Sequence, residues 1–420
     1  MDYNTAKAYI MELSSRGISP GLNNVKQLLC ELKNPEKSLR IIHIAGTNGK
    51  GSVGAYLSEI INADGKNCAR FVSPCVGEYE NTFLFNGKSV EKELIGDCTD
   101  DLFDAIRRLE KRNIFPTSFE AETALAFLIF GRLAPDYAII ECGMGGREDA
   151  TNAVSSTTLS VITNIALDHT GFLGNTISEI AYQKAGIIKH STPVVCAVLD
   201  YEAMTVIKEE CKAKNAELFI CPQPKIINMA DTYTEFSYKD DIYCTKMLGT
   251  YQVYNASLAI CASQVLDISQ LAISEGIKNA QWEYRFERFG KFIFDGAHNP
   301  HGAEALAKSL DVYTDPCDTA FICACFKDKA YEEIAKITAP YAKKVYCVTA
   351  PTDRGLNAKM LCDAFKKAGA DAVGCGSLSD AMSSAKSYKN IVVFGTLSIL
   401  FEAKRLSQSN QEKEAENAKM

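Results

Sequence analysis

The sequence lacks the features that would place the protein in a membrane, on nucleic acid or outside the cell. None of its apolar runs is long enough to span a bilayer, so no membrane association is expected. It has no block of basic residues and its formal net charge is −7, which makes nucleic acid a poor candidate for a partner. The first residues, MDYNTAKAYIMELSSRG, predict an amphipathic helix and lack the layout of a signal peptide. We therefore expect a cytoplasmic protein.

Cysteine is plentiful, but the spacing typical of a disulfide framework or a zinc site is missing. The 16 cysteines are scattered along the chain. The only close pair, Cys323 and Cys325, lies in a strand-like run, where side chains two positions apart share a face. Scattered cysteines of this kind fit reduced thiols in a cytoplasm, and a zinc site is not expected.

The pattern of apolar runs predicts an α/β protein. A chain of 420 residues is too long for one core, so two or three domains are expected. Short buried runs alternate with helical stretches, which predicts parallel sheets flanked by helices. The buried runs are Tyr137–Glu141, Leu159–Ile165, Pro193–Val198, Phe292–Asp295, Phe321–Cys325, Val345–Val348 and Ile391–Phe394.

Two domains of unequal size follow from this pattern. We place the N-terminal domain at residues 1–282 and a smaller C-terminal domain at residues 283–420, which opens with the strand KFIFD. The segment Gln223–Lys246 carries aromatic residues among polar ones and predicts short antiparallel strands at the edge of the first domain.

Residues 39–63 predict a buried strand, a glycine-rich loop and a helix that together form a phosphate-binding site. The loop reads GTNGKGS, and its glycines let the backbone approach an oxyanion near the amides of the following helix N-terminus. Lys50 adds a positive charge, and Ser52 adds a hydroxyl of the kind that ligates Mg²⁺. The spacing departs from the general P-loop pattern, because only two residues separate the first two glycines and Gly51 lies between the lysine and the serine. A glycine-rich turn without a ligand is the alternative.

Acidic and histidine side chains follow two more predicted strands at their carboxyl ends. Glu141 ends one buried run and is followed by three glycines within residues 143–146. Asp168 and His169 follow the next run. Open α/β sheets bind ligands at this edge, so a ligand role for His169 is favoured over that of a structural histidine.

The predicted C-terminal domain has a matching cluster after its first strand. The segment DGAHNPHG contains Asp295, His298 and Asn299. Arg285, in the preceding segment EYRFE, is placed to reach a phosphate from the linker between the domains.

Two further residues have an ordinary explanation when each is considered alone. Glu120 lies in the first turn of a predicted helix, where acidic residues usually complement the helix dipole. Lys184 lies on a predicted helix, where a lysine is usually a solvated surface charge.

Taken together, these segments closely resemble the folylpolyglutamate synthase and dihydrofolate synthase enzymes of the Mur ligase superfamily. The resemblance runs from about Gly17 to Leu400 and rests on nine pieces in order. They are GLNNV, HIAGTNGKGS, VSP, FEAETALAF, ECGMGGREDATN, LDHTGFLGNTISEIAYQKAGIIK, GTYQVYNA, YRFE and DGAHNP. The implied fold is α/β, with an N-terminal P-loop ATPase domain of Mur ligase type and a smaller, Rossmann-like C-terminal glutamate ligase domain.

The resemblance also implies which residues bind ATP, which would lie between the two domains. Asn255, Arg285 and Asp295 match positions that contact ATP, and His298 matches one close to its phosphates. The loop residues that would hold the phosphates, with Lys50 countering the β/γ charge, are Gly46, Thr47, Asn48, Gly49, Lys50, Gly51 and Ser52.

Metal ligands follow from the same resemblance. Ser52 and Glu120 would bind one Mg²⁺, and Ser73, Glu120 and His169 would bind a second. Lys184 matches a lysine that is carbamylated in this family. The added CO₂ turns a cation into an anion that can help to hold the metals, which would replace the surface role considered above.

The implied reaction is ATP-dependent amide formation through an acyl phosphate. A carboxylate on tetrahydrofolate or dihydropteroate would be phosphorylated, and the amino group of L-glutamate would then displace phosphate. The sequence leaves open whether the enzyme extends polyglutamate chains, adds only the first glutamate as a dihydrofolate synthase, or does both. The family is usually monomeric.

Two rival functions remain. A regulatory P-loop NTPase would explain the first domain, but the chain lacks a guanine-reading Asn-Lys-x-Asp segment and such a protein would not need DGAHNP. Another Mur-type amino-acid ligase is closer, although Gly51 and the segment YQKAGIIK argue against it. The chain also differs from many relatives at Cys75, at Asn81-Thr82 and at Gln183, and the first two differences bear on substrate preference.

Overall fold

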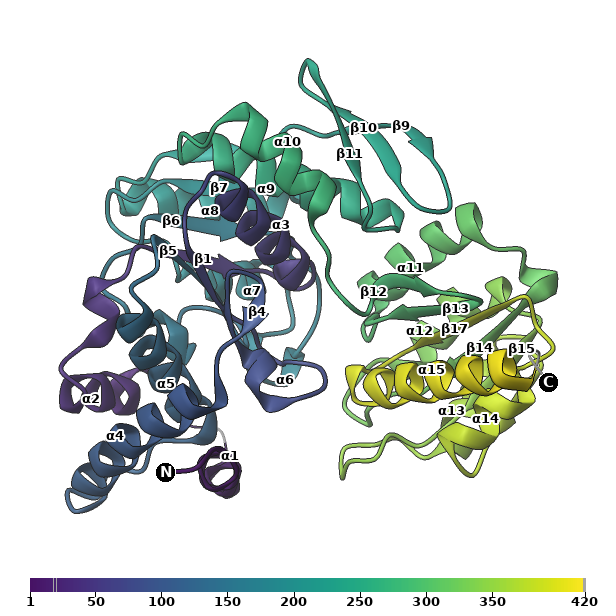
Figure 1. Ribbon diagram of the computed structural model, residues 1–420. Coiled ribbons are helices and arrows are strands. Elements are labelled where there is room, and N and C mark those ends of the chain that lie inside the picture. The colour runs from purple at the N-terminus through teal and green to yellow at the C-terminus, as the bar shows by residue number, and fades with distance from the viewer. Residues whose placement is uncertain (18, 20, 418–420) are drawn as a thin grey trace. The chain divides into compact units, whose positions relative to one another are not determined.

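The computed structural model describes residues 1–417 except 18 and 20, and it contains two compact units (Figure 1). The N-terminal unit comprises residues 1–225, 238–243 and 255–280. The C-terminal unit comprises residues 226–237, 244–254 and the chain from Gln281 onward. The chain passes between the units several times in residues 226–280, and the single boundary placed at 282 from the sequence stays a prediction.

A mixed eight-stranded sheet forms the centre of the N-terminal unit. Its strands are β1 (Ile41–Ala45), β2 (Cys68–Phe71), β3 (Phe83–Phe85), β4 (Lys88–Ser89), β5 (Tyr137–Glu141), β6 (Leu159–Ile162), β7 (Val194–Cys196) and β8 (Leu218–Ile220). The strand order is β4-β3-β2-β5-β1-β6-β7-β8. The strands β2, β5, β1, β6, β7 and β8 run parallel, as predicted, whereas β3 and β4 add an antiparallel edge.

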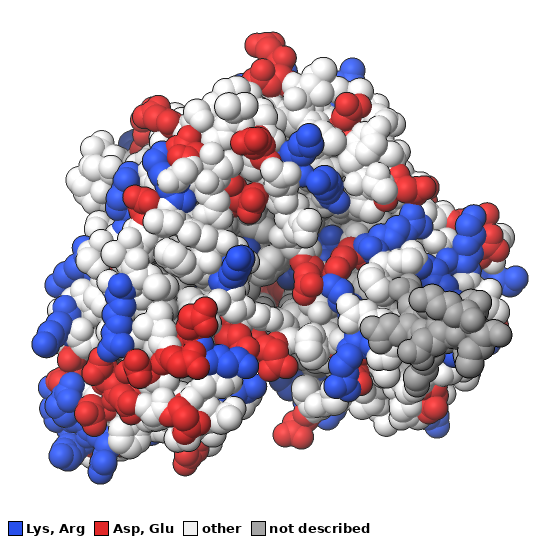
Figure 2. Space-filling model, viewed as in Figure 1, with Lys and Arg blue, Asp and Glu red and all other residues white. Residues whose placement is uncertain are grey.

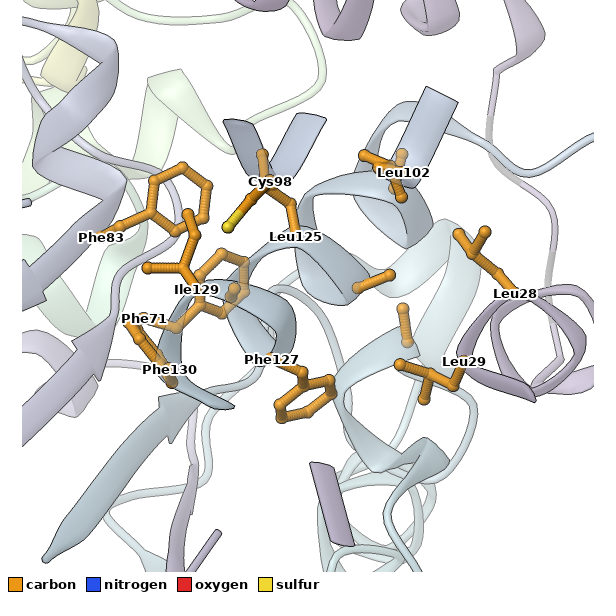
Figure 3. Packing of buried hydrophobic residues seen from close by; sticks show 14 of the residues in the cluster. Leu28, Leu29, Phe71, Phe83, Cys98, Leu102, Leu125, Phe127, Ile129 and Phe130 are labelled. Carbon is orange, nitrogen blue, oxygen red and sulfur yellow. The ribbon is translucent and has the colours of Figure 1, made fainter. Parts of the chain in front are cut away.

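Helices cover this sheet. They are α1 (Tyr3–Glu12), α2 (Asn23–Glu31), α3 (Lys50–Ala63), α4 (Lys92–Glu110), α5 (Ser118–Leu133), α6 (Thr170–Leu173), α7 (Ile177–Ala185), α8 (Tyr201–Ala213), α9 (Thr250–Val265) and α10 (Gln270–Asn279). Figure 3 shows apolar side chains of α2, α4 and α5 packed together with Phe71 and Phe83 from the sheet. No described helix is both long enough and apolar enough to cross a bilayer.

The strand β1 and the helix α3 form the unit that the sequence predicts around the glycine-rich loop. All five residues of β1 are buried, as expected for a central parallel strand that is covered on both faces. Helix α3 begins at Lys50, directly after the left-handed Gly49, and packs on β2 and β5. On its other side α3 packs closely against α10, where Gly276 faces the backbone of Ile60.

The C-terminal unit has a six-stranded sheet of its own. Its strands are β12 (Arg285–Phe289), β13 (Phe292–Asp295), β14 (Thr319–Cys323), β15 (Lys344–Cys347), β16 (Ala372–Gly374) and β17 (Asn390–Phe394), in the order β12-β13-β17-β14-β15-β16. Its helices are α11 (Pro300–Tyr313), α12 (Tyr331–Thr338), α13 (Ala358–Lys367), α14 (Leu378–Ser384) and α15 (Leu400–Asn417). The pairs from β13 to β16 are parallel, which agrees with the predicted Rossmann-like architecture.

The expectation that this unit opens with KFIFD was wrong. Strand β12 precedes that segment and pairs antiparallel with β13 at the edge of the sheet. Its residues RFERF mix charged and aromatic side chains, so they do not stand out in a search for continuous apolar runs. Arg285 therefore lies on a strand and not in a linker.

The remaining segments are short. A three-stranded sheet contains β9 (Lys225–Met229), β10 (Thr234–Tyr238) and β11 (Asp241–Thr245), which confirms the strands expected between 223 and 246. Their expected place at the edge of the first domain was wrong, because residues 226–237 and 244–245 belong to the C-terminal unit. Single 3₁₀ turns occur at Leu13–Arg16, Pro35–Ser38, Tyr79–Thr82, Ala150–Ala153, Pro316–Asp318, Ala339–Tyr341 and Leu397–Ile399.

On the face shown in Figure 2, basic and acidic side chains are interspersed.

The close contact between α10 and α3 gives a test of the fold. A Cβ at Gly276 would lie 2.4 Å from the Cα of Ile60, so Gly276→Ala should destabilise the protein by about 1–3 kcal/mol although alanine favours helices. Urea unfolding measures the loss. The control is Gly374→Ala, whose Cβ would meet only ordinary contacts, the nearest at 3.8 Å. Equal stability of the two variants would contradict the packing described.

Candidate functional site

The glycine-rich loop can adopt its conformation only with glycine at two positions. Gly46 has φ +155°, and a Cβ there would lie 1.8 Å from Oγ1 of Thr163. Gly49 has φ +86°, and a Cβ there would lie 2.5 Å from Oδ1 of Asn255. The structure thus places Asn255, one of the predicted ATP contacts, directly against the loop.

Hydrogen bonds from the segment after β6 hold the loop open. The backbone N–H of Thr47 donates to the carbonyl of Asn164 at 2.8 Å, and the N–H of Asn48 donates to Oδ1 of the same residue at 2.8 Å. The hydroxyl of Thr163 donates to the carbonyl of Asn48 at 2.6 Å. The loop conformation is therefore set by the protein itself. Sequence reasoning gave Thr163 and Asn164 no such role, because their contact with the loop is long-range.

Lys50 begins α3 and faces the carboxyl edge of the sheet. Its Nζ donates to the carbonyl of Gly46 at 3.0 Å. Burial lowers the pKa of Lys50, and the carboxylates of Glu141, Asp168 and Asp149 oppose that shift. The three carboxylates and Lys50 therefore lie near one another, as the convergence of strand ends predicts. Glu141 was noted in the sequence as a strand end but was not among the residues assigned a role.

A buried ion pair supports the carboxyl edge of the sheet. Arg70 on β2 contacts Glu141 at the end of β5 at 2.7 Å, and each side chain is 3% exposed. Arg70 also donates to the carbonyl of Gly51 in the first turn of α3. Gly54 leaves room for the pair, because a Cβ there would lie 2.8 Å from Nε of Arg70. The sequence signal for Arg70 is a charged residue inside the buried strand CARF.

Lys184 is buried, so the idea of a solvated surface lysine is wrong. It lies near the end of α7 and is 3% exposed. Burial, assisted by the positive charge of Lys50, lowers the pKa of Lys184 to about 7, against the opposing effect of neighbours that include Asp168 and Asp149. A large share of its amine is therefore neutral near pH 7, and neutral amines are nucleophilic.

Two of the predicted metal ligands present oxygen atoms that have no hydrogen-bond partner. The buried Oγ of Ser52 is one, and the buried Oε1 of Glu120 is the other. The other oxygen of Glu120 accepts from the N–H of Thr117 at 2.8 Å and completes a capping box at the start of α5. Glu120 thus has its ordinary role at a helix N-terminus and keeps one oxygen for another partner.

The other predicted metal ligands lie in the segments that follow β2 and β6. Ser73 comes two residues after β2. His169 adopts a left-handed conformation, with φ +49°, and its N–H donates to Oδ1 of Asp168 at 2.8 Å. Among the described residues, no three His, Cys, Asp or Glu side chains are grouped so that they could hold a metal ion. The predicted sets combine such residues with serine hydroxyls.

A second cluster lies at the end of β13 in the C-terminal unit. Asp295 accepts hydrogen bonds from the hydroxyl of Tyr251 at 2.6 Å, from the N–H of Phe286 at 2.9 Å and from the N–H of Ala297 at 2.8 Å. Arg285 is opposite Asp295 in the β12–β13 register. Burial raises the pKa of Asp295, and Arg285 and the hydrogen bonds oppose that effect. Tyr251 was not expected in this cluster.

An irregular strand places Arg285. The pairing of β12 with β13 shifts between Arg285 and Glu287, which is a β-bulge. Tyr284 and Phe286, on either side of Arg285, both have positive φ, +61° and +54°, a costly conformation for aromatic residues. Nearby, Nδ1 of His298 donates to the carbonyl of Gly296 at 2.8 Å. The predicted residues thus form two clusters, one in each unit.

Known proteins share this architecture. The family model for the Mur ligase middle domain matches residues 44–263, and that for the Mur ligase glutamate ligase domain matches residues 284–397. Both units are therefore those of a Mur ligase.

Individual relatives show to which family of Mur ligases the chain belongs. Dihydrofolate synthase/folylpolyglutamate synthase of Bacillus subtilis is 34% identical over 381 residues, which covers 86% of this chain and 88% of that protein. The crystal structure of folylpolyglutamate synthase from Thermotoga maritima has 29% identity and a TM-score of 0.84, with 96% of each chain covered. E. coli FolC in complex with DHPP and ADP has 25% identity and a TM-score of 0.87, over 98% of this chain and 99% of that one. The chain belongs to the dihydrofolate synthase/folylpolyglutamate synthase family.

The buried ion pair can be tested through stability. Arg70→Met would leave Glu141 buried without its partner, so we expect a loss of about 3–5 kcal/mol in the free energy of unfolding. The control is Arg354→Met, which breaks the exposed pair of Arg354 with Asp328 and should cost less than about 1 kcal/mol. Denaturant unfolding compares the two variants. Similar losses in both would show that the buried pair does not support the fold.

Proposed function

We propose that this protein is an ATP-dependent ligase that adds L-glutamate to tetrahydrofolate, extending its polyglutamate chain, with dihydropteroate as a second acceptor. The observation that carries the proposal is the preset loop with Lys50 at the carboxyl edge of the sheet, in a chain whose two units match the Mur ligase models. Relatives named dihydrofolate synthase and folylpolyglutamate synthase support the substrate class. An enzyme restricted to dihydropteroate is the alternative, and a Mur ligase for another acceptor is a more distant one.

The reaction requires anions to approach one another. The folate carboxylate is activated as an acyl phosphate at the expense of ATP, and the amino group of L-glutamate then displaces phosphate. The loop amides and Lys50 offset the charge of the phosphates. Lys50 would exchange its contact with the Gly46 carbonyl for a phosphate oxygen, so the binding of nucleotide replaces a hydrogen bond to a neutral acceptor by one to an anion.

The other ATP contacts are assigned by position. The loop residues 46–52 and Asn255 are the contacts in the N-terminal unit. Arg285, Asp295 and His298 are the contacts from the C-terminal unit. The guanidinium of Arg285 would pair with phosphate. Because Nδ1–H of His298 donates to the Gly296 carbonyl, Nε2 would donate to phosphate only in the protonated imidazolium form.

Mg²⁺ fits the oxygen donors of the N-terminal unit. Ser52 and Glu120 are proposed to bind one ion, and Ser73, Glu120 and His169 a second. The unpartnered oxygens of Ser52 and Glu120 support the proposal, because buried polar atoms normally have a partner. Bound Mg²⁺ would offset the charge of the phosphates.

Carbamylation of Lys184 would change the charge balance of the same edge. Its neutral amine would attack CO₂, form a C–N bond and release one proton, leaving an anionic carbamate. The low pKa of Lys184 favours this step, and conversion to an anion removes the repulsion between Lys184 and Lys50.

The domain roles follow from these assignments. Residues 1–282 are proposed to form the ATP-binding domain with the folate-binding elements, and residues 283–420 the glutamate ligase domain. We expect a monomeric, cytoplasmic enzyme whose partners are its small-molecule substrates.

The acceptor can be identified by ADP release. Purified protein with Mg²⁺, ATP and L-glutamate should release ADP when tetrahydrofolate is added, and a second series with dihydropteroate decides whether both acceptors are used. Omission of L-glutamate is the control for simple ATP hydrolysis. Turnover with dihydropteroate alone would select the dihydrofolate synthase alternative. If neither acceptor supports glutamate-dependent turnover, the proposed function is wrong.

The carbamate can be observed directly. With ¹³C-labelled bicarbonate, the wild-type protein should show a carbamate carbon by NMR that is missing from Lys184→Arg. At fixed dissolved CO₂ the signal should grow as pH rises through about 7, because the pKa of Lys184 is lowered to about 7 and only the neutral amine reacts. Lys189→Arg is the matched control, since the pKa of Lys189 is lowered to about 8 and this variant should keep the signal. A signal that persists in Lys184→Arg would exclude carbamylation of Lys184.

A further inference from the structure

A nearly buried lysine on the C-terminal helix has no part in the reaction described above. Lys404 lies on α15, which packs against β13 and β17 of its own unit (Figure 1). Its side chain is 12% exposed, which is unusual for a lysine unless it is paired. Two carboxylates pair with it, because Nζ of Lys404 donates to Glu283 at 2.7 Å and to Glu287 at 2.6 Å. One cation therefore joins two glutamates that are four positions apart in the chain.

The two glutamates flank Arg285, the phosphate contact proposed for this unit. Glu283 comes two residues before Arg285, and Glu287 comes two residues after it. The bulge in β12 falls between Arg285 and Glu287, so Lys404 contacts the chain on both sides of the bulge. Glu287 adds a contact at the same place, because its second carboxylate oxygen accepts from the N–H of Tyr284 at 3.0 Å.

The ring of Tyr284 completes the contact between α15 and the bulge. Nζ of Lys404 lies 5.3 Å from the centre of that ring, within the range of a cation–π interaction. The ring also packs edge-on against Phe294 of β13, with 6.5 Å between the ring centres. The carbonyl of Tyr284 accepts from Nη1 of Arg285 at 3.4 Å. Lys404 thus stabilises a residue that itself contacts the guanidinium of Arg285.

The guanidinium of Arg285 lies at the carboxyl end of β13. A Cβ at Gly296 would lie 1.8 Å from Nη1 of Arg285, so only glycine leaves room for the group there. The same segment, DGAHNP, contains His298, the other phosphate contact proposed for this unit. The binding of nucleotide therefore depends on where the bulge places this guanidinium.

The charge of Lys404 has a second effect on Arg285. Without this lysine, the carboxylates of Glu283 and Glu287 would lose their cation, and they would compete with phosphate for the guanidinium. Burial opposes the charge of Lys404, but its hydrogen bonds to Glu283 and Glu287 raise its pKa above the ordinary value of a lysine. Lys404 is therefore a cation at neutral pH and neutralises charge on both carboxylates.

We propose that Lys404 is a positioning residue for nucleotide binding, which holds the β12 bulge and its two glutamates so that the guanidinium of Arg285 stays available to a phosphate. The inference rests on the contact between Arg285 and ATP in the proposed function. Lys404 acts through Arg285 and does not touch the nucleotide. Its effect on nucleotide binding should therefore disappear when Arg285 is removed.

The experiment measures binding of the non-hydrolysable ATP analogue AMPPNP, with Mg²⁺, to the full-length protein by calorimetry. Arg285→Met should raise the Kd about 10- to 100-fold, because a charged hydrogen bond to phosphate is lost. Lys404→Met should raise the Kd about 3- to 10-fold. In a protein that already carries Arg285→Met, Lys404→Met should have no further effect, and a general structural role would not produce this non-additivity.

Two further variants separate the charge of Lys404 from its contribution to the fold. Lys404→Arg keeps a cation that can bond both glutamates, so it should bind AMPPNP nearly as tightly as the wild-type protein. Lys404→Gln keeps a hydrogen-bond donor without the charge and should weaken binding. It replaces Lys404→Met in the comparison if circular dichroism shows that the methionine variant does not fold.

A second paired lysine of the C-terminal unit is the matched control. Nζ of Lys344 donates to both carboxylate oxygens of Asp371 at 2.8 Å. Lys344 lies on β15, which is not adjacent to β12 in the sheet. Lys344→Met also removes the cation of an ion pair, but it should leave the Kd for AMPPNP unchanged.

The results distinguish this inference from the proposed function. The inference alone is overturned if Arg285→Met weakens binding and Lys404→Met does not, or if the two effects add in the double variant. The contact between Arg285 and ATP would stand in that case. If Arg285→Met binds AMPPNP as tightly as the wild-type protein, the proposed contact is wrong, and the inference falls with it.

Discussion

The pairing of Arg70 with Glu141 is the constraint on which the nucleotide-binding edge depends. Moving two charges out of water is costly, and the cost is recovered only when the geometry is good and the remaining polar atoms are satisfied. Here the guanidinium bonds both the carboxylate of a neighbouring strand and the Gly51 carbonyl at the start of α3. The pair thereby links two parallel strands to the first turn of the helix. The phosphate loop is supported from within the sheet as well as by its own hydrogen bonds.

This support matters because the edge is electrostatically crowded. Lys50 and Lys184 repel each other across a group of carboxylates, and burial opposes the charge on both lysines. If the phosphate loop were flexible, it would move so that Lys50 and Lys184 were farther apart, and the repulsion would decrease. The hydrogen bonds to Thr163 and Asn164 prevent that movement, so the charges stay in place until phosphates and cations neutralise them.

The sequence alone predicted the features that depend on residues close together in the chain. It missed those that depend on contacts between distant segments. The strand, loop and helix over 39–63 are contiguous, and buried runs, glycines and Lys50 are enough to define them. The burial of Lys184 could not be seen in its own helix, because it depends on neighbours such as Lys50 and Asp149 from distant segments. The resemblance to a family supplied that residue where composition and periodicity had suggested a surface position.

Strand β12 and Glu120 show two other limits of prediction from the sequence alone. A mixture of charged and aromatic residues such as RFERF occurs in edge strands but also in polar linkers, so the position of Arg285 on a strand was not evident. Glu120 was explained correctly as a helix-terminal residue, and its capping box confirms this. Its second, unpartnered oxygen is visible only once the surrounding side chains are placed.

The bulge in β12 has a consequence for how the enzyme would fail on heating. Tyr284 and Phe286 keep a strained backbone only because both side chains are buried, at 4% and 1% exposure. Slight loosening of the surrounding core would let this backbone relax, and Arg285 between them would leave its register opposite Asp295. The sheet would survive that change, because its other strands pair independently of β12. On heating, activity should therefore be lost at a lower temperature than the one at which the sheet unfolds, because Arg285 leaves its position first.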